Sequence, residues 1–460
     1  MKRIISSAIQ ACAVLLMCVL WSCADKKTSG LLTMVGDDAR YVYLLSPEAV
    51  LKSLDARIEG GRIVLPGELQ AVAGSMNSPI FDMLTKVRGL DFEQVMLASY
   101  GGADAFGLVR VKDEAALTRS LKDLDLKPRR KDDYVIFNSA GEHNASAVLY
   151  EGLLFIVPSA DAVRTMDGLV EKAKTPLAPW KTAAIDDCSG AAFFGLASPA
   201  VAAGKAVYVF RVDLDGAKAK ARVSWTDADG KSLKTTDADG LQFASMGAGK
   251  DILDAGAMFN MAFCGFRDAS VMDVLDVAGM GFYGAQYRGI LKNLTGGFCL
   301  SGSVDMRSAD MPRFLLTAAL DATSGNAAGA LEALSALATQ QGLPVSAVAG
   351  GCALDLPGVC SVKASVKGDE VLVTADGGLK RDAGATVSLP DGCLFYVSCD
   401  ITPENMAALN IHGFESGVDA TMTVFETHAE AEARFGGDGG FLRQLASLLL
   451  ALEVPTYGVL

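Results

Sequence analysis

Short apolar runs and longer amphipathic segments alternate along the chain, a pattern typical of a mixed α+β protein. The first folded run, residues 41–45, predicts a strand, and Ser46, Pro47 and Glu48 follow it. Serine suits the N-cap of a helix, proline suits its first position, and glutamate opposes the helix dipole. We therefore expect a helix over residues 49–54.

The same patterns predict the rest of the first half. Strands are expected at 95–100, 105–111, 134–139, 145–150 and 153–158, and helices at 79–88, 114–124 and 161–174. Glu151-Gly152 between two of these strands is typical of a tight hairpin turn. This order predicts an α+β domain over residues 35–178, with a curved antiparallel sheet and helices packed on one face.

Pro176, Pro179 and Trp180 mark a predicted boundary, after which a second α+β domain is expected over residues 179–460. A β-meander at 206–246 opens this domain. Later strands are expected at 257–264, 297–304, 313–320, 360–366, 371–375, 394–398 and 418–425, and helices at 270–278, 326–339, 403–409 and 441–452.

The chain repeats itself weakly. Residues 38–54 and 391–409 each run from a strand through Ser/Thr-Pro-Glu to a helix, and residues 105–124 and 313–337 each run from a strand to an amphipathic helix. Two related halves would follow, the second carrying the meander at 206–246 as an insertion. Because capping chemistry recurs in many chains, the alternative of two unrelated halves stays open.

The amino-terminal stretch has the organisation of an export signal. A cationic start, Lys2-Arg3, precedes an apolar run over 4–20 that is too short for a lasting membrane span. The Leu-Trp-Ser-Cys motif at 20–23 resembles the lipobox of bacterial lipoproteins. That resemblance implies removal of residues 1–22 and acylation of Cys23 on its thiol and amine. An ordinary secretory signal is the alternative.

The lipobox and the layout together resemble a family of uncharacterised Bacteroidetes lipoproteins with a duplicated α+β domain of unknown function. Cys23, the opening at 38–54 and the unit at 105–174 carry this resemblance. It implies a cell-envelope location, expected in the outer membrane, and an unassigned activity. Residues 23–34 are themselves expected to form a short tether. Surface-exposed members often carry acidic residues after the cysteine, whereas this chain has Lys26-Lys27. The sequence therefore leaves open whether the protein is anchored in the periplasmic or the surface leaflet.

Composition excludes several classes. The net charge of −13 and the aromatic content of 7% argue against binding of nucleic acid.

Of ten cysteines, seven follow Cys23, and none of them forms a C-x-x-C motif. Cys393 and Cys399 lie roughly 20 Å apart on an extended strand, beyond the reach of a disulfide. Cys352 and Cys360 flank a turn and could be bridged, but free buried thiols are the preferred interpretation.

No catalytic or cofactor motif stands out. A G-x-S-x-G elbow is absent, and His143, His412 and His428 lie in unrelated polar contexts, which disfavours a Ser-His-Asp or Cys-His site. His428 precedes Glu430 and Glu432 on an expected short helix, without the H-E-x-x-H spacing of a zinc site.

The remaining candidates for a metal or cofactor are turns and a glycine-rich fragment. The Asp-Ala-Asp-Gly stretches at 227–230 and 237–240 lack the EF-hand spacing and suit hairpin turns. The Gly-Lys fragment at 247–251 lacks the flanking residues of a P-loop. No metal and no cofactor are therefore expected.

Three functions follow from these patterns. The preferred hypothesis is a lipid-anchored, non-catalytic binding or scaffolding module, whose partners are the membrane through Cys23 and an unidentified envelope protein. The alternative is a periplasmic carrier of an apolar ligand, favoured by the apolar helix expected at 441–452. A glycan or peptide hydrolase is the third. A carrier requires an apolar cavity, a hydrolase a cleft with paired catalytic groups, and a scaffold only an exposed apolar patch.

Overall fold

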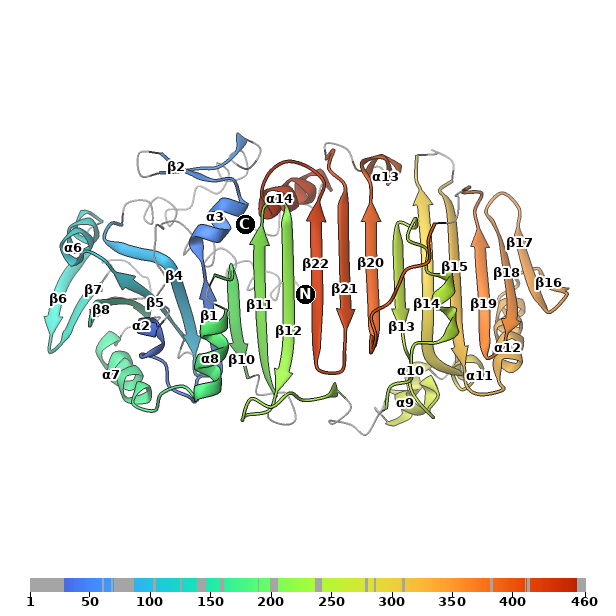
Figure 1. The fold of residues 1–460 in the computed structure, drawn as a ribbon, viewed down its shortest axis with the longest axis horizontal. Helices are drawn as coiled ribbons and strands as arrows, with labels where there is room; N and C mark the ends of the chain where they lie inside the picture. Colours follow the sequence, from blue (N-terminus) through green and yellow to red (C-terminus); the bar gives the residue numbers. More distant parts are fainter. Residues whose placement is uncertain are drawn as a thin grey trace. The chain divides into compact units, whose positions relative to one another are not determined.

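The computed structural model forms two compact units: unit 1 comprises residues 1–232 and 438–460, and unit 2 comprises residues 233–437 (Figure 1). The structure describes residues 29–59, 62–67, 69, 87–101, 105–124, 126–138, 146–157, 161–188, 190–198, 206–235, 242–277, 280–284, 287–307, 311–380, 384–409, 411 and 414–452.

Unit 1 contains an antiparallel sheet with the strand order β12-β11-β10-β1-β4-β5-β9-β8-β7-β6. The sheet strands are β1 (Tyr41–Leu45), β4 (Leu90–Ser99), β5 (Ala105–Val111), β6 (Lys127–Lys131), β7 (Tyr134–Asn138), β8 (Ser146–Tyr150), β9 (Leu153–Val157), β10 (Phe193–Ala197), β11 (Val207–Asp215) and β12 (Lys218–Thr226). A separate hairpin joins β2 (Arg57–Glu59) and β3 (Arg62–Val64). The helices are α2 (Ser29–Leu32), α3 (Pro47–Ser53), α6 (Glu114–Asp123), α7 (Ala162–Ala173), α8 (Pro179–Asp187) and α14 (Phe441–Ala451).

Both faces of the unit 1 sheet carry helices. Successive side chains of a strand point to opposite faces, so the residues of β1 divide between two cores. Val42 packs in a cluster with Met166 of α7, which defines the α7 face. Leu117 of α6 packs on Leu149 and Leu154 of the opposite face, here called the α6 face. The prediction of helices on one face only is therefore wrong for this unit.

Unit 2 contains an antiparallel sheet with the order β22-β21-β20-β13-β14-β15-β19-β18-β17-β16. Its strands are β13 (Phe259–Phe263), β14 (Leu294–Asp305), β15 (Arg313–Ala322), β16 (Val345–Val348), β17 (Gly351–Leu356), β18 (Cys360–Lys367), β19 (Glu370–Asp376), β20 (Phe395–Ile401), β21 (Val418–Val424) and β22 (His428–Phe435). Its helices are α9 (Val271–Val277), α10 (Gly281–Gly284), α11 (Arg288–Leu291), α12 (Ala327–Gln340), α13 (Pro403–Ala408) and the 3-10 helix η2 (Ala248–Ile252).

The predicted capping chemistry is confirmed in both units. The Ser46 hydroxyl accepts a hydrogen bond from the Ala49 amide at 3.4 Å and begins α3. The Thr402 hydroxyl accepts from the Asn405 amide at 3.3 Å and begins α13. Proline follows each cap, where its missing N–H costs no helical hydrogen bond.

The mixed α+β class with antiparallel pairing is confirmed, but the units divide the chain differently from the predicted domains. Residues 179–232 belong to unit 1, because strands β10–β12 continue its sheet and Ile185 of α8 packs in its core. The meander expected at 206–246 is therefore the end of the first sheet rather than an insertion into the second domain. Near the end of the expected meander, Phe243 forms an isolated bridge with Phe266 of unit 2.

One further expectation changes, and the preferred interpretation of the cysteines as free thiols agrees with the structure. His428 opens strand β22 rather than a short helix, because Ala429, Ala431 and Ala433 alternate with polar residues. All seven described cysteines are free, and the β17–β18 register pairs Cys352 with Ala364 rather than with Cys360.

The helix expected at 79–88 begins outside the described residues. Across the described part of the chain, no helix has the length and apolarity needed to cross a membrane.

Candidate functional site

An apolar groove lies on the α6 face of unit 1. Its volume is about 440 Å³. Alternate residues of four neighbouring strands supply its side chains: Tyr41 and Tyr43 of β1, Val95, Leu97 and Ser99 of β4, Ala105, Gly107 and Val109 of β5, and Ile156 of β9. The strand register places Tyr43 beside Leu97, Leu97 beside Gly107, and Gly107 beside Ile156.

The groove is open above Gly107 because glycine has no side chain. A methyl group added at Gly107 would lie 3.4 Å from the Leu97 Cδ2 atom and 3.7 Å from the Ile156 Cβ atom, which is ordinary packing distance. A side chain at this position would therefore fit without a backbone shift and would occupy space that is open between its neighbours. Ile156, on the far wall, is 44% exposed.

Aromatic rings extend the apolar surface on the β10 side of the groove. The Tyr43 ring centroid lies 5.9 Å from that of Phe193 and 5.7 Å from that of Phe210. Gly195 makes room for the Phe210 ring, since any added Cβ would overlap it. Burial raises the pKa of the Tyr43 hydroxyl, so this group stays neutral.

The groove has almost no polar chemistry of its own. Two tyrosine hydroxyls and the Ser99 hydroxyl are its polar side-chain groups, and none of its side chains is charged. The interior strands β1, β4 and β5 are each paired on both edges, so their backbone groups are already bonded. Such a surface can hold an apolar ligand, and its lining side chains include no general base that could activate the Ser99 hydroxyl.

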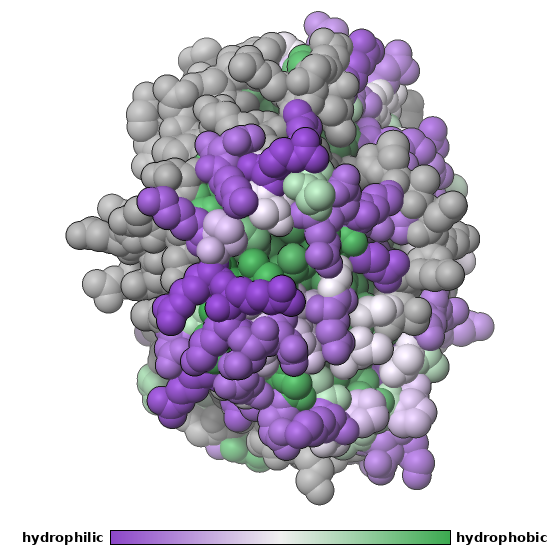
Figure 2. Space-filling view, turned by 90° about the vertical axis from the view of Figure 1, so that its left-hand side faces the viewer, coloured by the Kyte–Doolittle hydropathy of each residue, from purple (hydrophilic) through white to green (hydrophobic). Residues whose placement is uncertain are grey.

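Apolar side chains are also visible on the side of unit 1 that carries α6, β6 and α7. Figure 2 shows them in a depression among mainly hydrophilic side chains. A surface of this kind is common on single-domain proteins at ligand or partner sites.

Unit 2 contains a larger cleft of about 800 Å³, and its lining is mixed. Phe243 and Leu389 supply apolar surface, and Arg267, Asp391 and His428 supply polar groups. The cleft is the natural place to look for hydrolytic chemistry because a histidine, a carboxylate and the thiol of Cys393 line it.

The described groups of that cleft are not arranged as a Ser-His-Asp or Cys-His site. The His428 Nδ1 atom is 3.1 Å from the Thr427 hydroxyl, but its Nε2 atom is 3.6 Å from Glu430, too long for an orienting hydrogen bond. The imidazole also stacks on Phe425 with ring centroids 4.6 Å apart. Burial raises the pKa of Cys393 to about 11, which keeps its thiol protonated and unreactive.

A partly buried carboxyl group lies beside Gly247, the residue before η2, in unit 2. Asp321 ends strand β15, and Glu370 is its cross-strand partner on β19. Burial, followed by repulsion from Glu370, raises the pKa of Asp321 to about 6. Gly247 and Gly297 approach so closely that a Cβ at either position would overlap the Asp321 carboxylate. The two glycines therefore hold the Asp321 carboxyl group in close contact with the backbone.

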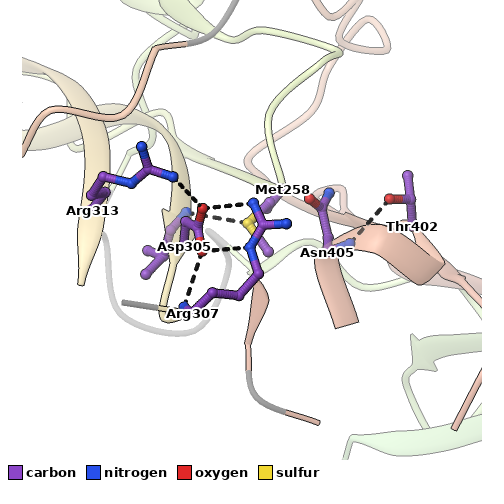
Figure 3. A network of polar contacts seen from close by, with 7 residues as sticks. Met258, Asp305, Arg307, Arg313, Thr402 and Asn405 are labelled. Atoms are coloured by element: carbon purple, nitrogen blue, oxygen red, sulfur yellow. Dashed lines mark hydrogen bonds and ion pairs between the residues drawn. The ribbon is translucent and has the colours of Figure 1, made fainter. Parts of the chain in front are cut away.

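Asp305 at the end of β14 lies in a saturated ion-pair network (Figure 3). Arg307 donates from Nε to Oδ1 at 2.9 Å and from Nη2 to Oδ2 at 2.7 Å, and Arg313 donates to Oδ2 at 2.9 Å. Hydrogen bonds from Arg307 hold the pKa of this carboxyl well below its usual range. The network is structural, because both carboxylate oxygens are already bonded.

The other residues singled out in the sequence divide into two sets. Cys23, His143, His412 and residues 237–240 lie outside the described residues. Asp227 accepts hydrogen bonds from the Asp229 and Lys231 amides at 2.9 Å each, and so shapes a turn. In the parts of the chain that the structure describes, no group of three or more His, Cys, Asp or Glu side chains could hold a metal ion.

The chain was compared with family models, with curated proteins and with solved structures. No family model matches, and no curated protein or solved structure is similar to the chain. The groove of unit 1 therefore has to be interpreted from its own chemistry.

Proposed function

We propose that this protein is a lipid-anchored envelope protein whose globular part binds an acyl chain in the unit 1 groove. The observation that carries the proposal is the groove itself, about 440 Å³ of open space with an almost entirely apolar lining. This volume lies within the range of about 300 to 1,000 Å³ found for small-molecule sites. The role combines the expected binding module with the expected carrier of an apolar ligand.

An acyl chain suits this surface better than a peptide does. A peptide usually joins a sheet by pairing with a free strand edge, and β1, β4 and β5 have no free edge at the groove. An extended peptide laid flat on these side chains would leave its own N–H and C=O groups without partners. An acyl chain has no such groups, and burial of each CH₂ contributes about 0.8 kcal/mol.

Photo-crosslinking tests the binding site on the full chain in lipid vesicles. Hexadecanoate carrying a diazirine would be added, the sample irradiated, and the modified peptides mapped by mass spectrometry. We expect adducts on peptides of β1, β4, β5 and β9, and we expect excess unlabelled hexadecanoate to remove them. The variant Gly107→Phe should lower this labelling about tenfold or more, equivalent to about 1.4 kcal/mol.

The matched control places the same side chain elsewhere in unit 1. Gly168 lies exposed on α7, and a Cβ there meets no atom within 4 Å. Gly168→Phe should therefore leave labelling unchanged. Equal labelling of the two variants, or adducts spread evenly over the surface, would remove the proposed site.

The anchor is part of the same proposal and has its own test. The lipobox resemblance supports acylation of Cys23, and several acyl chains would hold the protein on a bilayer almost permanently. Cys23→Ala should release the protein from washed membranes into the soluble fraction. Continued membrane association of the variant, or an unmodified amino terminus in the intact mass of the wild type, would contradict lipidation.

A further inference from the structure

Three segments of unit 2 line its cleft of about 800 Å³. Residues 243–251 lead into η2, residues 386–394 lead into β20, and residues 425–428 connect β21 to β22. The Leu394 amide donates a hydrogen bond to the Val424 carbonyl oxygen at 2.8 Å, which joins the second segment to the strand that precedes the third. The volume lies within the range of about 300 to 1,000 Å³ found for small-molecule sites.

Aromatic rings line the cleft from two of these segments. Phe243 belongs to the first segment, and its ring stacks on Phe266 with centroids 5.8 Å apart. Phe425 belongs to the third segment, where the His428 imidazole stacks on it at 4.6 Å. Leu389 adds apolar surface from the second segment. Rings of this kind offer flat apolar surface on which the aromatic part of a ligand can pack.

Two carboxylates of the lining are already paired with cations from outside it. The Asp251 carboxylate accepts a hydrogen bond from the Lys367 ammonium group at 2.9 Å. The Glu426 carboxylate lies 2.9 Å from the ammonium group of Lys234. Neither Lys367 nor Lys234 is a lining residue, so each pair contributes no net charge to the cleft.

The remaining charges of the lining do not balance. Lys250 and Arg267 are its two cations, and among the described residues neither forms an ion pair or a side-chain hydrogen bond. Asp391 is exposed on the turn from Pro390 to Cys393 and is the one further carboxylate of the described lining. Two cations against one carboxylate leave a single positive charge, with histidine counted as neutral. One anionic group of a ligand would balance it.

We propose that this cleft binds an aromatic carboxylate, a ligand class different from the acyl chain assigned to unit 1. The ring would pack against Phe243 and Phe425, and the carboxylate would pair with Arg267 and Lys250. A guanidinium group matches a carboxylate in shape and can donate two parallel hydrogen bonds to it. The site is therefore defined by apolar surface and unpaired positive charge together.

Other ligand classes fit the cleft less well. A hydrocarbon chain would displace water from Arg267 and Lys250 without replacing its hydrogen bonds. A phosphate monoester carries about two negative charges near neutral pH and would exceed the single positive charge available. An aromatic carboxylate supplies one negative charge and a flat apolar body, which are the two features that the lining lacks a partner for.

Photolabelling of the full chain with 4-benzoylbenzoate tests this site. The neutral amide 4-benzoylbenzamide has nearly the same shape and serves as the matched probe. Adducts would be mapped by mass spectrometry after irradiation. We expect the acid to label peptides that contain residues 243–251, 386–394 and 425–428, about tenfold more strongly than the amide does. Raising the ionic strength should weaken labelling by the acid and leave labelling by the amide unchanged.

Two substitutions test the cations directly. Arg267→Gln and Lys250→Gln each remove one positive charge from an exposed side chain, and each should lower labelling by the acid about tenfold. Lys363→Gln is the matched control, because Lys363 is exposed on β18 outside the cleft and should leave labelling unchanged.

Equal labelling of the wild type by the acid and the amide would overturn the inference, and this comparison needs no variant to fold. Acid adducts confined to other surfaces would overturn it as well, as would full labelling of both Arg267→Gln and Lys250→Gln. None of these results bears on the acyl-chain groove, because hexadecanoate adducts in unit 1 are measured with a different probe.

Discussion

Replacement of Asp321 by asparagine should stabilise the protein at neutral pH. The carboxyl group is enclosed by Gly247 and Gly297 and faces Glu370, and burial together with the charge of Glu370 raises its pKa. Asparagine has nearly the same shape but carries no charge, so it removes the cost of burying a carboxylate. The unfolding free energy of the variant should therefore differ from that of the wild type only at pH values at which Asp321 is ionised in the wild type.

The size of this effect follows from the pKa of Asp321, which rises from 3.8 to about 6 on folding. At about 1.4 kcal/mol per pH unit, this difference corresponds to at most about 3 kcal/mol. Because the side chain is not fully buried, solvent screening reduces the expected gain to about 1 to 2 kcal/mol at pH 7.5. The folded state binds the proton more tightly, so the wild type loses stability as the pH rises from about 4 to about 6.

Urea unfolding of wild type and Asp321→Asn at pH 4 and pH 7.5 measures this difference. The gain in unfolding free energy should be present at pH 7.5 and nearly absent at pH 4. Asp355→Asn is the matched control, because Asp355 is exposed on β17 of the same unit and should show no gain at either pH. A variant less stable than the wild type at pH 7.5, or a gain independent of pH, would refute the reasoning.

Three further substitutions test the packing. Asp305→Asn weakens the arginine network and should lower unfolding free energy by about 1 to 3 kcal/mol at pH 7, with the difference shrinking as acid protonates the wild-type carboxylate. Tyr134→Phe removes the 2.9 Å hydrogen bond to Asp167 and should cost about 1 kcal/mol in urea unfolding. Gly195→Ala should displace the Phe210 ring and cost about 1 to 3 kcal/mol, with a changed near-ultraviolet circular dichroism spectrum.

Much of the fold could be predicted because its signals are local. Ser46 and Thr402 each mark the start of a helix, because the hydroxyl group accepts a capping hydrogen bond from the amide three residues later. The Glu151-Gly152 turn follows from the same kind of local chemistry, with φ of 47° and 74°. Such features depend on neighbouring residues alone, so the sequence pattern is sufficient to identify them.

The elements that were missed show where local signals compete. In strand β22, alanine alternates with glutamate, and this period of two is typical of a strand. Both residue types favour helices, so their intrinsic propensity predicted a helix instead. Strand β6, Lys127–Lys131, is exposed along its length and is held by its pairing with β7. Pro179 marked an expected boundary, but it begins α8, where proline at the first position is favourable.

The candidate site was beyond prediction from local pattern. Its walls come from Tyr43, Leu97, Gly107 and Ile156, which are brought together by pairing between strands far apart in sequence. The open space depends on the absence of a side chain at Gly107, and a glycine in a strand gives no sign of what its neighbours leave uncovered.

Crystallography with 12-bromododecanoate tests the central claim most directly, because bromine can be located by its anomalous signal. An acyl chain in the unit 1 groove would place bromine density over Gly107, between Leu97 and Ile156, and Gly107→Phe would abolish it. An empty groove at saturating ligand, with bromine only at other surfaces, would contradict the account.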